Sequence, residues 1–147
     1  MASQTILERF RDISSIAASV VDNNEAEDQH IALGLITYNE IMGTTETITT
    51  NTTGNLMIND AIAFLASSFV YQKVMRTKMF KDTGLLEWQR FYQGALEIMY
   101  GIDQTKVMYV ASRDLYIVRD PGVDAKPFNY SIYRDNDGAS STTGGGA

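Results

Sequence analysis

The spacing of hydrophobic residues predicts a first helix over residues 4–21. Its apolar side chains recur every three or four residues and so fall on one stripe of a helix, made of Ile6, Phe10, Ile13, Ala17 and Val20. The polar run Asp22-Asn-Asn24 then interrupts the pattern. We expect the first helix to bury this stripe and to end before Asn24.

A second helix is predicted from Asn24 to Gly43. Asn24 is a suitable N-cap, and the acidic residues that follow it favour the positive end of a helix. The expected buried stripe is Ile31, Leu35, Tyr38 and Met42. Gly34 is unfavourable inside a helix and is best explained by a close helix crossing, whereas Gly43 is a typical C-terminal glycine.

A threonine-rich segment, TTETITTNTTGN, fills residues 44–55. β-branched residues favour extended backbone, so the segment predicts a long loop or a loose β-hairpin. A loop of this length in a small domain usually has an external partner or is mobile.

The most apolar helix is predicted over residues 58–80. It carries no charge from Ala61 to Gln72, and apolar side chains nearly encircle it, so we expect it to be the central helix. A turn at residues 82–84 leads to a fourth helix that ends near Tyr100. The apolar side chains of this fourth helix keep helical spacing and indicate core packing: Trp88, Phe91, Tyr92, Ala95, Ile98, Met99 and Ile102.

After Gly101 the pattern changes to alternation and predicts a β-hairpin from residues 106–111 and 115–118. Residues 127–133 follow as a third strand or an extended arm, with Phe128, Tyr130 and Tyr133 as candidate contact residues. The predicted fold is mostly α, with four helices and a small β-hairpin. Its expected parts are a helical domain at 1–103, the hairpin and arm at 104–134, and a Gly/Ser/Thr-rich tail at 135–147 that a neighbouring chain orders.

Composition excludes several kinds of chemistry. The 147 residues contain no cysteine and one histidine, which excludes disulfides, thiolate nucleophiles and histidine-based metal sites. No leader and no membrane-spanning run is found, so we expect no membrane partner. There is no phosphate-binding glycine loop and no nucleophile elbow. We therefore predict that the protein is not an enzyme, with no catalytic residue, cofactor or metal.

The remaining candidates for chemistry have ordinary structural explanations. His30 near a helix start is typical of an exposed surface histidine rather than a catalytic base. Glu25, Glu27 and Asp28 could hold a cation, but they lack the loop of a calcium site and are typical of a solvated helix N-terminus.

Charge is divided along the chain. Residues 1–60 carry two basic and nine acidic side chains, whereas residues 61–100 carry five basic and three acidic ones, and the whole chain has a net charge of −6. The candidate basic cluster is Lys73, Arg76, Lys78 and Lys81. It could pair with Glu25, Glu27 and Asp28 of a neighbouring copy, line a DNA channel, or be ordinary solvated surface. An acidic chain is poorly suited to reading DNA.

The helix order resembles that of phage head–tail connector adaptors, small head-completion proteins that lie under the portal of tailed phages. The resemblance rests on three stretches: the acidic Asn23-Asn-Glu-Ala-Glu-Asp28, the helix from Ile31 to Gly43 with its Tyr38, and the aromatic–basic Phe69-Val-Tyr-Gln-Lys-Val-Met-Arg76. It covers about residues 5–100. The hairpin and long arm after Gly101 depart from the shorter members.

The resemblance implies a structural virion protein at the head–tail interface, assembled in the host cytoplasm. It would form a homo-oligomeric ring, a dodecamer, between the portal protein and a further neck or tail-completion protein. DNA would pass through the ring as cargo during genome ejection, and the C-terminal segment would engage the portal. The alternative from another class is a small helical regulatory or partner-binding module, antitoxin-like or transcription-associated.

Overall fold

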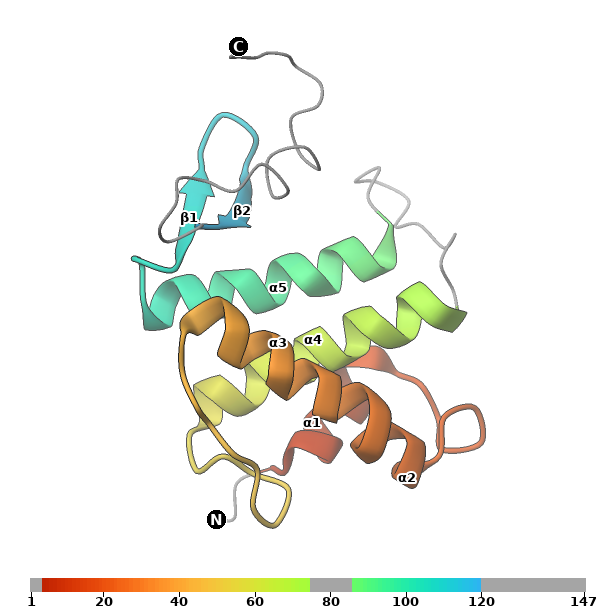
Figure 1. Ribbon diagram of the computed structural model, residues 1–147. Helices are drawn as coiled ribbons and strands as arrows, with labels where there is room; N and C mark the ends of the chain where they lie inside the picture. Colours follow the sequence, from red (N-terminus) through yellow and green to blue (C-terminus); the bar gives the residue numbers. More distant parts are fainter. Residues whose placement is uncertain (1–3, 75–85, 120–147) are drawn as a thin grey trace. The chain divides into compact units, whose positions relative to one another are not determined.

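The computed structural model describes residues 4–74 and 86–119, and these are mostly helical. The elements are α1 (Ile6–Ser14), α2 (Asn23–Glu25), the π-helical η1 (Ala26–Ile31), α3 (Ala32–Met42), α4 (Leu56–Val74), α5 (Glu87–Ile102), β1 (Val107–Val110) and β2 (Leu115–Val118) (Figure 1). Because α2, η1 and α3 run on without a break, the described part has four helical segments followed by a two-stranded antiparallel hairpin. The predicted fold class is confirmed.

Some predictions concern residues outside the described ranges. These are the end of the third predicted helix beyond residue 74, the turn at 82–84, the arm at 127–133 and the tail at 135–147. The described elements belong almost entirely to one unit, Met1–Ile117.

Helix α4 lies at the centre of this unit and confirms the prediction made from its uncharged stretch. It packs against α1, η1, α3 and α5. Its buried residues point in every direction around the helix axis: Ala61, Ile62, Ala63, Leu65, Ala66, Ser67, Ser68, Val70 and Tyr71. A helix surrounded by others needs this all-round apolar character.

Helix α1 is shorter than the sequence predicted. It ends at Ser14 because Ser15 adopts a left-handed conformation, φ 59°, and its N–H bonds to the Arg11 carbonyl. The Tyr71 hydroxyl holds this end by donating to the Ser14 carbonyl at 2.7 Å. Consequently the predicted stripe fails beyond Ser14: Val20 is 57% exposed, and Val21 is buried in its place.

The N-cap of the second helical segment lies two residues earlier than predicted. Asp22, and not Asn24, is the N-cap, because its carboxylate accepts a bond from the Glu25 N–H at 2.8 Å. Gly34 provides the predicted close crossing with α4, since a Cβ there would lie 3.0 Å from the Ile62 carbonyl oxygen. Gly43 ends the segment as predicted, with φ 67°.

The side chain of Gln93 in α5 is hydrogen-bonded to the backbone of the β-hairpin. The Gln93 amide donates to the Tyr116 carbonyl at 2.9 Å and accepts from the Tyr116 N–H at 2.7 Å, as a neighbouring strand would. The Tyr116 ring also lies near those of Tyr100 and Tyr109, with centroids 5.4 and 5.0 Å away.

Among the described helices none combines the length and the apolar character needed to cross a bilayer.

Candidate interaction surface

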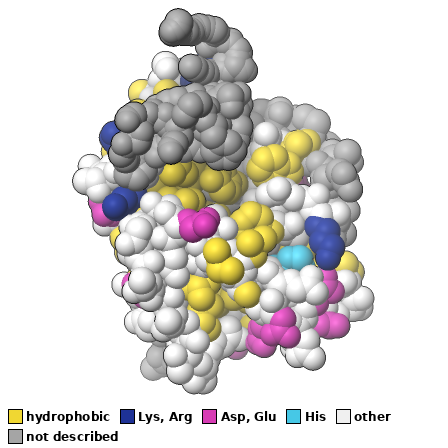
Figure 2. All heavy atoms as spheres, viewed as in Figure 1, with side chains coloured by type: hydrophobic (Ala, Val, Ile, Leu, Met, Phe, Trp, Pro, Cys, Tyr) yellow, Lys and Arg dark blue, Asp and Glu magenta, His cyan; other side chains and the backbone are white. Residues whose placement is uncertain are grey.

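Helix α3 carries apolar side chains on its outer face as well as its inner one. Tyr38 and Met42 are buried against the core, whereas Leu33 and Ile36 are 44% and 55% exposed. The stretch from Ile31 to Asn39 contains no charged residue. In Figure 2, hydrophobic side chains gather on the face of the molecule where α3 lies. We call Leu33, Ile36 and the groove beside them the α3 face.

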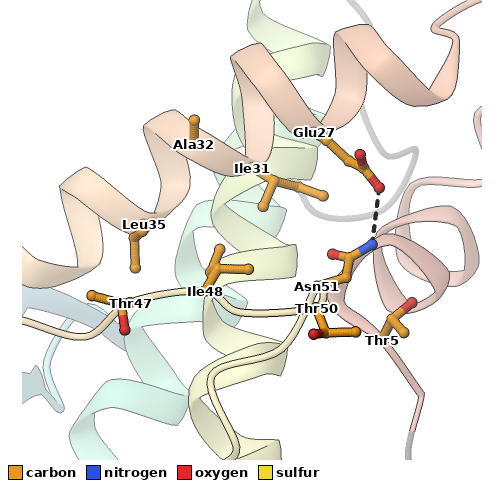
Figure 3. Close-up of a pocket in the computed structure, with 9 residues that line it drawn as sticks. All are labelled: Thr5, Glu27, Ile31, Ala32, Leu35, Thr47, Ile48, Thr50 and Asn51. Carbon is orange, nitrogen blue, oxygen red and sulfur yellow. Dashed lines mark hydrogen bonds between the residues drawn. The ribbon is translucent and has the colours of Figure 1, made fainter.

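The groove has a volume of about 800 Å³ and separates α3 from the threonine-rich loop (Figure 3). Its lining combines apolar side chains with threonines, one amide and one carboxylate: Thr5, Glu27, Ile31, Ala32, Leu35, Thr47, Ile48, Thr50 and Asn51. Ile31 is buried, whereas Leu35 and Ile48 are half-buried, so apolar surface remains open to a partner.

Two asparagines hold the loop in place beside α3. The Asn39 amide donates to the Glu46 carbonyl at 3.0 Å and accepts from the Glu46 N–H at 2.9 Å. The buried Asn59 accepts from the Thr53 N–H at 2.9 Å and donates to the Thr52 hydroxyl at 2.8 Å. The prediction of a loop or loose hairpin is therefore confirmed in one form: a loop with a single β-bridge between Thr49 and Thr52.

The tip of the loop is a tight two-residue turn. Thr50 and Asn51 both have positive φ, 54° and 64°, as the hairpin turn that matches strand twist requires. Asparagine tolerates this conformation, but a β-branched threonine does so at a cost. The turn is fixed from outside, because the Asn51 amide donates to the Glu27 carboxylate at 3.0 Å and the Asn51 carbonyl accepts from the Ile6 N–H at 3.0 Å.

The loop also affects Tyr38 beneath it. Burial raises the pKa of Tyr38 from 10.0 to about 12, and the carboxylates of Glu46 and Asp103 add to this rise. Glu46 belongs to the threonine-rich loop, so a carboxylate of this loop contributes to the environment of a core tyrosine.

The three acidic candidates, Glu25, Glu27 and Asp28, lie in different surroundings. Glu25 lies 3.4 Å from the His30 ring nitrogen and 3.8 Å from the Lys73 ammonium of the same chain, whereas Glu27 bonds to Asn51. Asp28 is exposed. Among the described residues of the predicted acidic and basic clusters, the structure therefore brings together Glu25 and Lys73. Arg76, Lys78, Lys81, Phe128, Tyr130 and Tyr133 lie outside the described residues.

The prediction that His30 is an exposed surface histidine is wrong. Only 5% of the residue is exposed. It lies in η1, whose buried residues are Ala26, His30 and Ile31, so the wider π-helical turn directs this ring inward. Within the described ranges no group of three or more possible metal ligands is found.

Sequence reasoning missed the α3 face itself. Leu35 was assigned to the buried stripe, whereas it lines the groove, and the exposed Leu33 and Ile36 were not singled out. The available signal was the uncharged run from Ile31 to Asn39, which leaves no polar face for solvent.

Comparison of the chain with models of protein families, with curated proteins and with solved structures finds no match. The likeness to head–tail connector adaptors stays a prediction drawn from the residues.

Proposed function

We propose that this chain is a structural head–tail connector adaptor. Copies of it form a ring, a dodecamer, between the portal and the neck or tail of a tailed virus, and the ring extends the channel through which DNA passes. The helix order that resembles this family supports the proposal. The open α3 face supplies a surface through which such a protein can assemble.

The α3 face is the single observation that carries the proposal. Leu33 and Ile36 are both about half exposed, and Leu35, which lies between them in sequence, lines the groove. Burying apolar surface contributes about 25 cal/mol for each Å² removed from water. A contact that covers the whole α3 face would therefore stabilise an assembly, whereas in the isolated chain this apolar surface is exposed to water.

Charge assigns different roles to the two predicted clusters. Lys73 has an acidic partner in its own chain, Glu25, so we do not assign it to the ring contact. Glu27 lines the groove and Asp28 is exposed next to it in sequence, so both can orient a basic neighbour, each such exposed pair contributing roughly 0.2–1 kcal/mol. Apolar contact would supply most of the stability, and charge would set the register.

The net charge of −6 fits a protein that lets DNA pass. A strongly basic lumen would hold the phosphate backbone, because each neutralised phosphate adds to affinity. In this proposal DNA is cargo and makes no specific contact.

Imaging of the virus particle tests the proposed function. The chain, labelled through a fused tag, is expected as a ring of density between the portal and the tail. Its absence from purified particles would overturn the proposal. A small soluble oligomer that binds a toxin or an operator by itself would favour the regulatory alternative.

A further inference from the structure

The outer wall of the groove has the properties of an unpaired strand edge. Thr47 and Ile48 run alongside α3 (Figure 3), and within the described part of the chain their backbone N–H and C=O groups make no hydrogen bond. The flanking Glu46 and Thr49 are held by Asn39 and Thr52. Such an edge is a template for another extended chain, which would gain main-chain bonds on one side and apolar contact on the other.

The chain itself contains a segment that matches this groove. Residues 126–134, KPFNYSIYR, place Phe128, Tyr130 and Ile132 at alternate positions, so that in an extended backbone all three point to one face. These residues lie outside the described ranges. Seven residues, 127–133, would span about 23 Å as a strand.

Charge favours the same pairing. The segment begins with Lys126, ends with Arg134 and contains no acidic residue. The groove is lined by Glu27, and the acidic residues Asp28, Glu40 and Glu46 belong to the elements that form it. A basic, alternately apolar strand is therefore complementary to this groove in both hydrophobicity and charge.

We propose that residues 126–134 of one copy bind as an added strand in the groove between α3 and residues 47–48 of a second copy. The hairpin that precedes the segment packs on α5 (Figure 1), and the groove lies between α3 and the threonine-rich loop (Figure 3). The proposal assigns the segment to a neighbouring copy because the self-association proposed above brings a second copy to the α3 face. The proposal deepens the self-association proposed above and rests on it, but it does not require a portal.

The absence of cysteine makes a direct cross-linking test possible. Thr47→Cys in one preparation of the full chain and Ser131→Cys in another, carrying a different tag, are mixed under mild oxidation. We expect a disulfide-linked pair in several-fold excess over the control pair, in which Ala18→Cys replaces Thr47→Cys. Ala18 is exposed but lies outside the groove. A yield no higher than that of the control would overturn the proposal.

Two further variants test the contribution of charge to this contact and whether the segment binds another copy or its own chain. Glu27→Gln removes the charge but keeps an oxygen that can accept the Asn51 bond, so it should lower the cross-linking yield without loosening the loop tip. An unchanged yield would contradict the role of charge. A chain that carries both cysteines should form linked multimers, whereas exclusive closure within one chain would overturn the exchange between copies.

The result can be separated from that of the particle experiment. Cross-linking without a ring in the particle would support this contact and overturn the viral role. A ring without cross-linking would overturn this contact alone.

Discussion

The Glu27 carboxylate accepts a hydrogen bond from the Asn51 side-chain amide at 3.0 Å, across 24 positions of sequence. This bond joins the π-helical segment to the tip of the threonine-rich loop and closes one end of the groove (Figure 3). The Asn51 carbonyl in turn accepts from the Ile6 N–H at the start of α1. Three elements that are distant in sequence thus meet at one residue, Asn51, through its side-chain amide and its backbone carbonyl.

Removal of this carboxylate should loosen the loop tip. In Glu27→Ala, we expect the Ile6 amide to exchange its hydrogen faster, while the free energy of unfolding falls by about 1 kcal/mol or less, as for an exposed charge-assisted bond. Hydrogen exchange read residue by residue measures this. Asp28→Ala removes a neighbouring acidic residue and is the control; equal acceleration in both variants would contradict the bond's role.

Replacing Thr50 by a residue that adopts positive φ more readily should stabilise the loop. Thr50 has φ 54°, a conformation that asparagine adopts more readily than a β-branched residue. Thr50→Asn should therefore raise the free energy of unfolding by about 0.5–1 kcal/mol in urea titration. The same change at Thr45, which does not have positive φ, should bring no gain. A loss at position 50 would show that the threonine side chain is needed there.

Two glycines should respond oppositely to alanine. Gly34→Ala would place a methyl group 3.0 Å from the Ile62 carbonyl oxygen, and since backbone yields little, we expect a loss of about 1–3 kcal/mol. Gly101→Ala meets only the end of Met57, 3.8 Å away, and should gain about 0.5–1 kcal/mol from helix propensity. Thermal or urea unfolding measures both. Equal effects at the two sites would argue against the close crossing of α3 and α4.

Alkaline pH should destabilise the fold through Tyr38. Its pKa is about 12 in the folded chain against 10.0 ordinarily, so the folded state retains the proton more tightly. The resulting stability is complete below about pH 10 and is lost as pH rises towards about 12. Between about pH 8 and about pH 11 the native chain should lose about 1.4 kcal/mol more than Tyr38→Phe. Parallel curves for the two proteins, from urea titrations at both pH values, would exclude this linkage.

Helical periodicity predicted most of the fold because long apolar stripes leave few alternatives. The uncharged stretch of α4 identified the central helix, and Gly34 and Gly43 identified a crossing and an end. The early end of α1 could not be predicted in this way. Its stripe continues to Val20, and the helix stops through the left-handed Ser15 and the Tyr71 bond to Ser14.

The groove was beyond sequence reasoning for a similar reason. Its wall is positioned by side-chain amides, those of Asn39 and Asn59, which bond to loop backbone and leave no trace in any periodic pattern. The inward position of His30 likewise depends on a π-helical turn. The sequence does show that no residue from Ile31 to Asn39 is charged. This feature indicates a contact surface only when the structure shows that Leu33 and Ile36 are exposed.

The most direct test of the central claim, that the α3 face drives assembly, is the mass of the complex with the portal protein encoded in the same genome. Ile36→Glu places a charge on the face, and Val20→Glu places one at an equally exposed position in the turn before α2, the two residues being 55% and 57% exposed. By native mass spectrometry, the native chain and Val20→Glu should load as a complete ring, and Ile36→Glu should not. Equal loading of both variants, or no loading of the native chain, would contradict the account.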